Sequence, residues 1–257
     1  MTNIKIDVRR DGIESGYVEA SFDKAKAELE EEKFSIITPE QFAQHRIAKG
    51  ANHSVSLNGA YTSMGSLMVP KRGRFLVVQS LVMQNPSKAI EAHRIGNEFY
   101  VSDNDAEKSL ASGSVIIPYN QSAVPFERFA DDPITAFVFG KTAGEYGAFL
   151  KESLREVEVA EMPLWFNDQE YIDSQKKPFA NHLWLRGLGS VYRSGLYGYY
   201  GDLSYLSGVR GVRESAEGTH ENFEAYTSVQ LKRIEDALKE LGFSGATKGL
   251  LEKLRIK

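Results

Sequence analysis

The segment from Leu183 to Arg213 limits what this chain can fold into more than any other part of it. The segment holds seven glycines, six aromatic residues and four arginines, with a single acid, Asp202. Ordering a glycine costs more chain entropy than ordering any other residue, so tight turns, close backbone approach or a bound ligand must compensate for it. Arginine beside tyrosine is also suited to stacking and to binding flat or anionic groups.

Length and composition are typical of a folded globular protein. The 257 residues are 42% hydrophobic and 26% charged, enough for one large domain or two small ones. We find no apolar run near the roughly 20 residues that a membrane helix needs, and the first ten residues lack the apolar core of a secretory signal. We therefore expect a cytoplasmic protein with no membrane partner.

Cysteine is absent, which excludes disulfides, thiolate metal sites and cysteine nucleophiles. Any metal would need the five histidines, and none of them are spaced i, i+4 on one helical face. They are His45, His53, His93, His182 and His220. We expect no metal and no cofactor.

Charge is segregated along the chain beneath a net value of -4. Residues 41–90 contain no Asp or Glu but six basic residues, and residues 174–213 contain six basic residues against Asp202. Buried strands exclude carboxylates, which would explain the missing acids but not the retained lysines and arginines. Two positive blocks, distant in sequence, are thus available for one binding patch.

Local patterns predict several elements. Thr38-Pro39-Glu40-Gln41 is a capping box that starts a helix to Lys49, and Asp132-Pro133 starts another. The run 75–83 reads as the strongest strand, and Ser228 caps an amphipathic helix that ends at Gly242.

Together these patterns predict an α+β fold with a mixed, largely antiparallel sheet flanked by short helices and a helical C-terminal segment. We expect one domain over residues 1–257. A subdivision near residue 178 is conceivable, into a core of 1–177 and a segment of 178–257 that holds the Gly/Tyr/Arg-rich stretch and the C-terminal helices.

Familiar catalytic and nucleotide motifs are incomplete. Gly140-Lys141-Thr142 lacks the preceding glycine of a phosphate-binding loop, since position 135 is Thr. Gly187-Leu188-Gly189 lacks the third glycine of a dinucleotide fingerprint, since position 192 is Tyr. No G-x-S-x-G nucleophile elbow occurs.

The leading hypothesis is a protein that binds single-stranded DNA or RNA through a localised basic and aromatic patch. Arginines and lysines would contact phosphates while tyrosine rings stack on bases. The residues proposed for this patch are Lys71, Arg72, Arg74, Arg186, Tyr192, Arg193, Tyr197, Tyr199, Arg210 and Arg213.

Other interpretations of the same residues remain open. The chain could be an enzyme that clamps a phosphorylated or carboxylated substrate with arginines and moves a proton through His53 or His182. It could be an assembly protein whose Arg/Tyr-rich segment is the interface of a homo-oligomer. The segment could also be a glycine-rich meander whose aromatic rings pack internally.

Overall fold

The computed structural model describes residues 4–9, 12–189, 194–198, 203 and 207–214. The chain divides into two compact units, Met1–Arg213 and Glu214–Lys257. The helices expected beyond Ser228 lie outside the described residues. The single domain and the subdivision near residue 178 stay predictions.

One sheet runs through the first unit. Eleven strands of the described part belong to it, and eight follow one another in the order β1-β2-β11-β4-β9-β10-β8-β7. Their bounds are β1 Lys5–Val8, β2 Ile13–Ala20, β11 Ser207–Glu214, β4 Ala60–Val69, β9 Phe179–Leu185, β10 Leu196–Tyr197, β8 Glu161–Trp165 and β7 Ala123–Pro125. β3 (Ser35–Ile36) pairs with β11, and β5 (Gly73–Val77) pairs with β4 and β6 (Ser114–Ile117).

The pairing is mixed. β4 is antiparallel to both β5 and β9, and β1–β2, β5–β6 and β7–β8 are antiparallel as well. β11 runs parallel to β4, and β10 runs parallel to β8. The predicted α+β class with a largely antiparallel sheet is confirmed.

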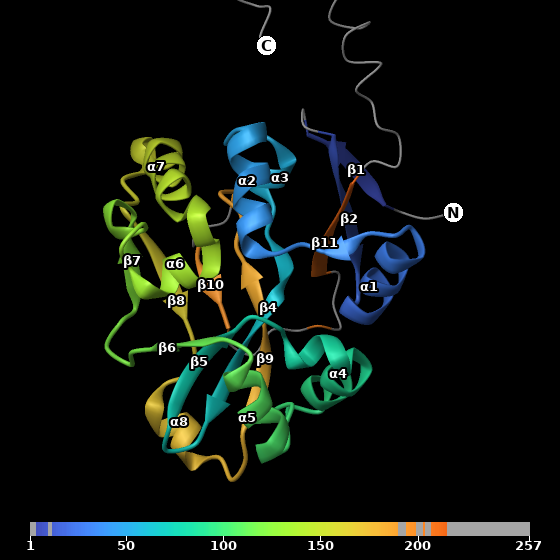
Figure 1. Cartoon of the computed structure of the whole chain (residues 1–257), viewed down its shortest axis with the longest axis vertical. Helices are drawn as coiled ribbons and strands as arrows, with labels where there is room; N and C mark the ends of the chain where they lie inside the picture. Colours follow the sequence, from blue (N-terminus) through green and yellow to red (C-terminus); the bar gives the residue numbers. More distant parts are fainter. Residues whose placement is uncertain (1–3, 10–11, 190–193, 199–202, 204–206, 215–257) are drawn as a thin grey trace, which may run out of the picture. The chain divides into compact units, whose positions relative to one another are not determined.

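Short helices lie at both ends of the sheet (Figure 1). Near one end are α2 (Pro39–Lys49), α3 (Ser54–Leu57), α6 (Pro133–Phe139) and α7 (Ala143–Ser153). Near the other are α4 (Pro86–Arg94), α5 (Asp103–Ala111) and α8 (Gln169–Ser174), while α1 (Phe22–Glu31) lies beside β1 and β2. Short 3-10 turns complete the helical segments: η1 Leu81–Gln84, η2 Phe126–Arg128, η3 Gly140–Thr142 and η4 Arg155–Val157.

Local chemistry explains where these helices begin. The capping box of α2 is formed as expected, because the Gln41 amide donates to Thr38 Oγ1 at 3.1 Å and the Thr38 amide donates to Gln41 Oε1 at 3.0 Å. α6 begins after Asp132, whose carboxylate accepts from the amide of Ile134 at 2.9 Å.

The largest core cluster lies between the sheet and helices α2, α6 and α7. Phe129, Phe139 and Tyr146 are fully buried there with ring centroids 4.8–6.3 Å apart. Each such ring contributes roughly 1.5–3 kcal/mol by leaving water. This cluster fixes α2 against the sheet, and α2 carries the arginine that organises the candidate site.

The long strand predicted for 75–83 is wrong in its second half. β5 ends at Val77, and η1 begins at Leu81. Between them the Ser80 amide donates to the Ser63 carbonyl at 3.0 Å, which turns the chain back onto the β4 segment. Apolar composition alone did not reveal that tertiary contact.

Candidate functional site

Arg46, on α2, is completely buried, yet no carboxylate is among its hydrogen-bond acceptors in the described part of the chain. Its guanidinium also lies 4.2 Å from the centroid of the Phe42 ring. The acceptors are the Val55, Asn58 and Arg186 carbonyls at 3.4, 3.0 and 2.9 Å and the Tyr146 hydroxyl at 2.7 Å. Five guanidinium N–H groups suit such a set of diverging oxygens.

Arg74 is buried in the same manner. Its donors reach backbone carbonyls at the end of β6 and in the loops that follow β6 and β8. These carbonyls belong to Ile117 (3.2 Å), Pro118 (2.6 Å), Gln121 (3.3 Å), Phe166 (3.5 Å) and Asn167 (3.2 Å). Burial lowers the pKa of Arg74 from its ordinary value.

On β11, Arg210 is buried and Arg213 is half-buried, and both contact other segments of the first unit. Arg210 is 1% exposed and donates to Ser15 Oγ at 2.8 Å, with Asp7 Oδ2 3.8 Å away. Burial lowers its pKa to about 10, although Asp7 acts in the opposite direction. Arg213 donates to Glu14 Oε2 at 2.7 Å and to the Glu32 carbonyl at 2.6 Å.

These contacts explain part of the charge pattern of the sequence. Arg46 and Arg74 remain in the acid-free block because their guanidinium groups bind buried carbonyl oxygens that no acid could satisfy. Arg74 and Arg210 therefore cannot contact phosphates, which corrects their assignment to a nucleic-acid patch. Part of the positive charge in the two blocks is therefore buried, at Arg46, Arg74 and Arg210.

Two other predicted residues lie at the β4–β5 turn and are exposed. Arg72 forms an ion pair with Glu107, and the Lys71 amide donates to Asp173 Oδ1 at 2.6 Å. Tyr192, Arg193 and Tyr199 lie outside the described residues.

Arg186 and Tyr197 do come together, with a third residue that the sequence reasoning missed. The Arg186 guanidinium carbon lies 4.5 Å from the Tyr197 ring centroid, and that ring lies 5.8 Å from the ring of Trp165. Trp165 is 40% exposed, and the other two side chains are half-buried. We call Arg186, Tyr197 and Trp165 the stacked face.

Strand pairing creates this face. Tyr197 on β10 is in register with Trp165 on β8, so their side chains stand side by side although 32 residues separate them. The aromatic pair Trp165-Phe166 was visible in the sequence, but only the parallel pairing of β8 with β10 shows which ring meets Tyr197.

Glycines allow the backbone near the face to pack tightly. A Cβ on Gly187 would lie 2.0 Å from the Leu57 carbonyl oxygen, and one on Gly198 would lie 2.1 Å from the Phe166 ring. The Leu188 amide donates to the Ser56 carbonyl at 2.8 Å. Close backbone approach therefore accounts for two of the glycines that made the segment unusual.

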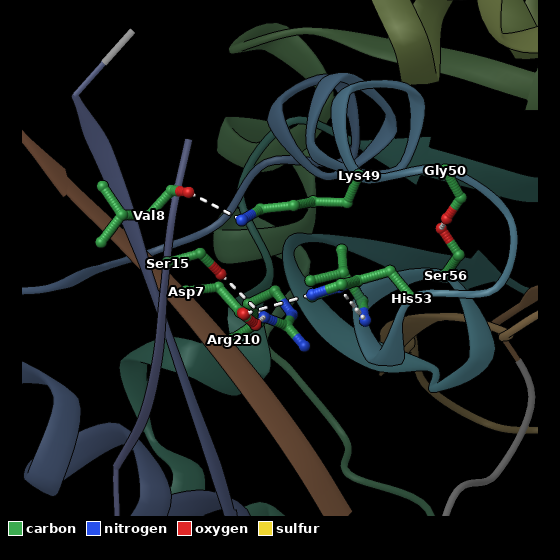
Figure 2. A network of polar contacts seen from close by, with 9 residues as sticks. Asp7, Val8, Ser15, Lys49, Gly50, His53, Ser56 and Arg210 are labelled. Atoms are coloured by element: carbon green, nitrogen blue, oxygen red, sulfur yellow. Dashed lines mark hydrogen bonds and ion pairs between the residues drawn. The ribbon is translucent and has the colours of Figure 1, made fainter. Parts of the chain in front are cut away.

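The proposed acid–base residue His53 lies at the start of α3 and faces Asp7 of the edge strand β1 (Figure 2). Its Nδ1 accepts from the Val55 amide at 3.2 Å and caps α3, so the ring proton lies on Nε2, which is 3.5 Å from Asp7 Oδ1. Lys49 Nζ donates to the Val8 carbonyl at 2.7 Å nearby. Both contacts join α2 and α3 to the edge strand β1.

His182, the other acid–base candidate, belongs to the core. Its ring packs 4.4 Å from the Phe22 ring and 5.0 Å from the Tyr61 ring, and Nδ1 lies 2.6 Å from Ser80 Oγ. Burial lowers its pKa to about 3, so the imidazole is neutral at physiological pH. This position excludes the proton-transfer role suggested for it.

The described residues hold neither a cluster of metal-binding side chains nor a membrane-spanning helix. They contain no group of three or more His, Asp or Glu side chains placed to hold a metal ion. Nor does any helix among them have both the length and the apolar character required to cross a bilayer.

Comparisons with known proteins bear on the fold. Neither the protein-family models nor the curated proteins contain a match to this chain. The chain is similar to a solved structure described as "Accommodation of massive sequence variation in Nanoarchaeota by the C-type lectin fold". The two are 19% identical with a TM-score of 0.52, over 80% of this chain and 99% of the other.

The prediction of nucleic-acid binding is wrong. The similar structure has a C-type lectin fold, which points away from a nucleic-acid-binding class. The burial of Arg74 and Arg210 removes two of the phosphate contacts on which the prediction depended. The chain is therefore similar in fold to a C-type lectin structure.

Proposed function

We propose that this chain is a binding protein that holds a partner protein against the stacked face of Arg186, Tyr197 and Trp165. The observation that carries the proposal is the stack itself, a partly exposed row of one guanidinium and two aromatic rings from β8, β10 and the residue after β9. Trp, Tyr and Arg are the residues that most often dominate the energy of protein interfaces. Trp165 and Tyr197 lie on paired strands, which favours preorganised contacts over flexible ones.

The composition of the neighbouring sequence supports a protein ligand. Thirteen of the 21 residues from Arg186 to Leu206 are Gly, Tyr or Ser. The same residue types are enriched in antibody binding loops, where tyrosine supplies large contact area at low entropic cost and glycine and serine supply adaptability.

The fold also supports separate roles for the buried residues, which maintain the scaffold, and the exposed residues, which would contact the partner. The structural neighbour is described in terms of a fold that accommodates massive sequence variation. In our proposal, buried contacts such as Arg46 with Arg186 hold the scaffold, and the identity of the accessible residues on the face decides which partner binds.

The experiment is site-specific photo-crosslinking in the source cells. A photoreactive phenylalanine analogue replaces Trp165 in one variant and Tyr171 in a matched control, since both side chains are 40% exposed. We expect one protein to crosslink at position 165 and not at position 171. That protein is then purified and titrated by calorimetry.

Calorimetry with the purified partner gives the decisive comparison. Trp165→Ala and Arg186→Ala should each weaken binding at least tenfold, and Tyr171→Ala should not. Failure to crosslink any protein at position 165, or equal affinities for all three variants, would contradict the proposal. Crosslinking to a second copy of this chain would identify the face as a subunit interface and would also contradict it.

A further inference from the structure

We infer a second ligand site, for a free α-amino acid with an apolar side chain, in a hollow of about 260 Å³ that shares no residue with the stacked face. Three segments that are distant in sequence form its walls: the β4–β5 turn, the first turns of α5 and the segment between α8 and β9. It therefore lies at the end of the sheet where α5 and α8 are found (Figure 1). We call it the charged hollow, after the lining residues Arg72, Asp103, Glu107 and Lys176.

Only half of these charges are paired with one another. Arg72 and Glu107 form an ion pair across the hollow's lining. Within the described residues, Asp103 and Lys176 form neither an ion pair nor a side-chain hydrogen bond. A ligand that carries one positive and one negative group satisfies both residues, whereas a ligand with a single charge leaves one of them unmatched.

The remainder of the lining is apolar. Val69, Ala106 and Pro178 are buried, and Pro70 is half-buried. The lining residues, all of them described, include no amide or hydroxyl side chain, so nothing in the hollow favours an uncharged polar ligand. Two opposite charges beside an apolar floor match the ammonium, the carboxylate and the apolar side chain of an α-amino acid.

Hydrogen bonds fix the walls of the hollow in place. The Lys71 amide donates to Asp173 Oδ1 at 2.6 Å, which ties the β4–β5 turn to α8. The Val101 amide donates to the Pro178 carbonyl at 2.9 Å, which ties the segment before β9 to the chain that enters α5. Walls that are already ordered reduce the entropy cost of binding a small ligand.

The volume of the hollow limits the size of the ligand. Pockets for drug-sized molecules usually measure about 300–1,000 Å³. The charged hollow, at about 260 Å³, lies just below that range. A single amino acid therefore suits it better than a peptide.

The test titrates the full-length protein with L-leucine at low ionic strength, where screening of the charges is weakest, and follows binding by NMR. Two analogues each lack one charge: N-acetyl-L-leucine has no ammonium group, and L-leucinamide has no carboxylate. Each analogue should bind about fivefold more weakly than leucine, the size expected for loss of a partly exposed ion pair. Glycine, which has no apolar side chain, should also bind more weakly than leucine.

Two variants assign each ligand charge to its residue. Asp103→Asn should weaken leucine binding about fivefold but leave the affinity for N-acetyl-L-leucine unchanged, since that analogue has no ammonium group for the carboxylate. Lys176→Gln should weaken leucine binding by a similar factor but leave the affinity for L-leucinamide unchanged. Lys177→Gln, an exposed neighbour that does not line the hollow, is the matched control and should bind leucine like the wild type. Urea unfolding shows whether each variant is folded.

Several results would overturn the inference. One is the absence of leucine binding to the folded wild type at millimolar concentration, and another is equal affinity for leucine and both analogues. A Lys176→Gln variant that weakens leucinamide as much as leucine would also overturn it, because the loss would then not come from a contact with the carboxylate.

A last control separates this inference from the proposed function. Trp165→Ala should bind leucine like the wild type, because Trp165 does not line the charged hollow. Loss of leucine binding in that variant would place the amino acid at the stacked face and overturn the inference. Crosslinking at position 165 does not depend on leucine, so either proposal can fail while the other holds.

Discussion

The guanidinium of Arg46 donates a hydrogen bond of 2.9 Å to the backbone carbonyl of Arg186. The buried arginine on α2 therefore holds the residue just beyond β9 whose own guanidinium stacks on Tyr197. The two arginines in contact have different roles, since Arg46 is fully buried and Arg186 is half-buried with its guanidinium over an aromatic ring.

Replacing Arg46 by Met should destabilise the fold by about 3–5 kcal/mol, because several buried acceptors would lose their donor at once. Urea unfolding measures the loss. Arg155→Met is the matched control, since Arg155 is exposed and pairs with Glu152 on the surface. The control should leave the midpoint near that of the wild type, and equal losses would contradict a structural role for Arg46.

Arg74→Lys should be costly although it preserves the charge. A lysine ammonium cannot reach five carbonyl oxygens arranged around a planar guanidinium, so we expect a loss of about 2–4 kcal/mol. Arg72→Lys, two residues away, keeps an exposed ion pair and should change the unfolding midpoint little. Similar midpoints for the two variants would show that the Arg74 contacts contribute little.

His182 should make stability depend on pH. Its pKa is about 3 in the folded protein and near 6.5 when unfolded, so below pH 6.5 the unfolded state binds the extra proton. The stability that neutral His182 provides is complete above pH 6.5 and declines toward pH 3, by about 2 kcal/mol at pH 5. Between pH 7 and pH 5 the free energy of unfolding of His182→Gln should therefore fall by about 2 kcal/mol less than that of the wild type. The same pH dependence of the free energy of unfolding in both proteins, measured by urea unfolding, would contradict a buried neutral ring.

Asp7 should matter more than its partial exposure suggests. Asp7→Asn removes the carboxylate beside the buried Arg210 and weakens the contact with His53, so we expect a loss of about 1–3 kcal/mol. The control is Lys5→Gln, on the same strand as Asp7, which removes only an exposed ion pair with Glu19 of β2. Thermal unfolding measures the effect. Equal melting temperatures for Asp7→Asn and Lys5→Gln would show that the Asp7 contacts do not stabilise the fold.

Much of the fold was predictable because its signals are local. The capping box at Thr38 and the N-cap at Asp132 depend on residues within four positions, and both are formed. The strand over 75–83 failed because a contact between Ser80 and Ser63 turns the chain, and no local pattern encodes it.

The site was less predictable for the same reason. A sequence cannot separate Arg74, whose donors meet carbonyls inside the fold, from Arg186, whose guanidinium stacks on a half-buried ring. Nor does it pair Trp165 with Tyr197, which are neighbours only through the parallel register of β8 and β10. The segment 183–213 is rich in arginine and tyrosine, but the role of each of these residues depends on how deeply it is buried, which the sequence does not show.

The most direct test of the central claim compares Arg186→Ala with Arg74→Lys in the same two measurements. Arg186→Ala should reduce the affinity for the partner crosslinked at position 165 at least tenfold while leaving the urea midpoint close to that of the wild type. Arg74→Lys should lower the midpoint but leave the affinity of the folded protein unchanged. The reverse pattern, with affinity lost in Arg74→Lys and kept in Arg186→Ala, would contradict the account.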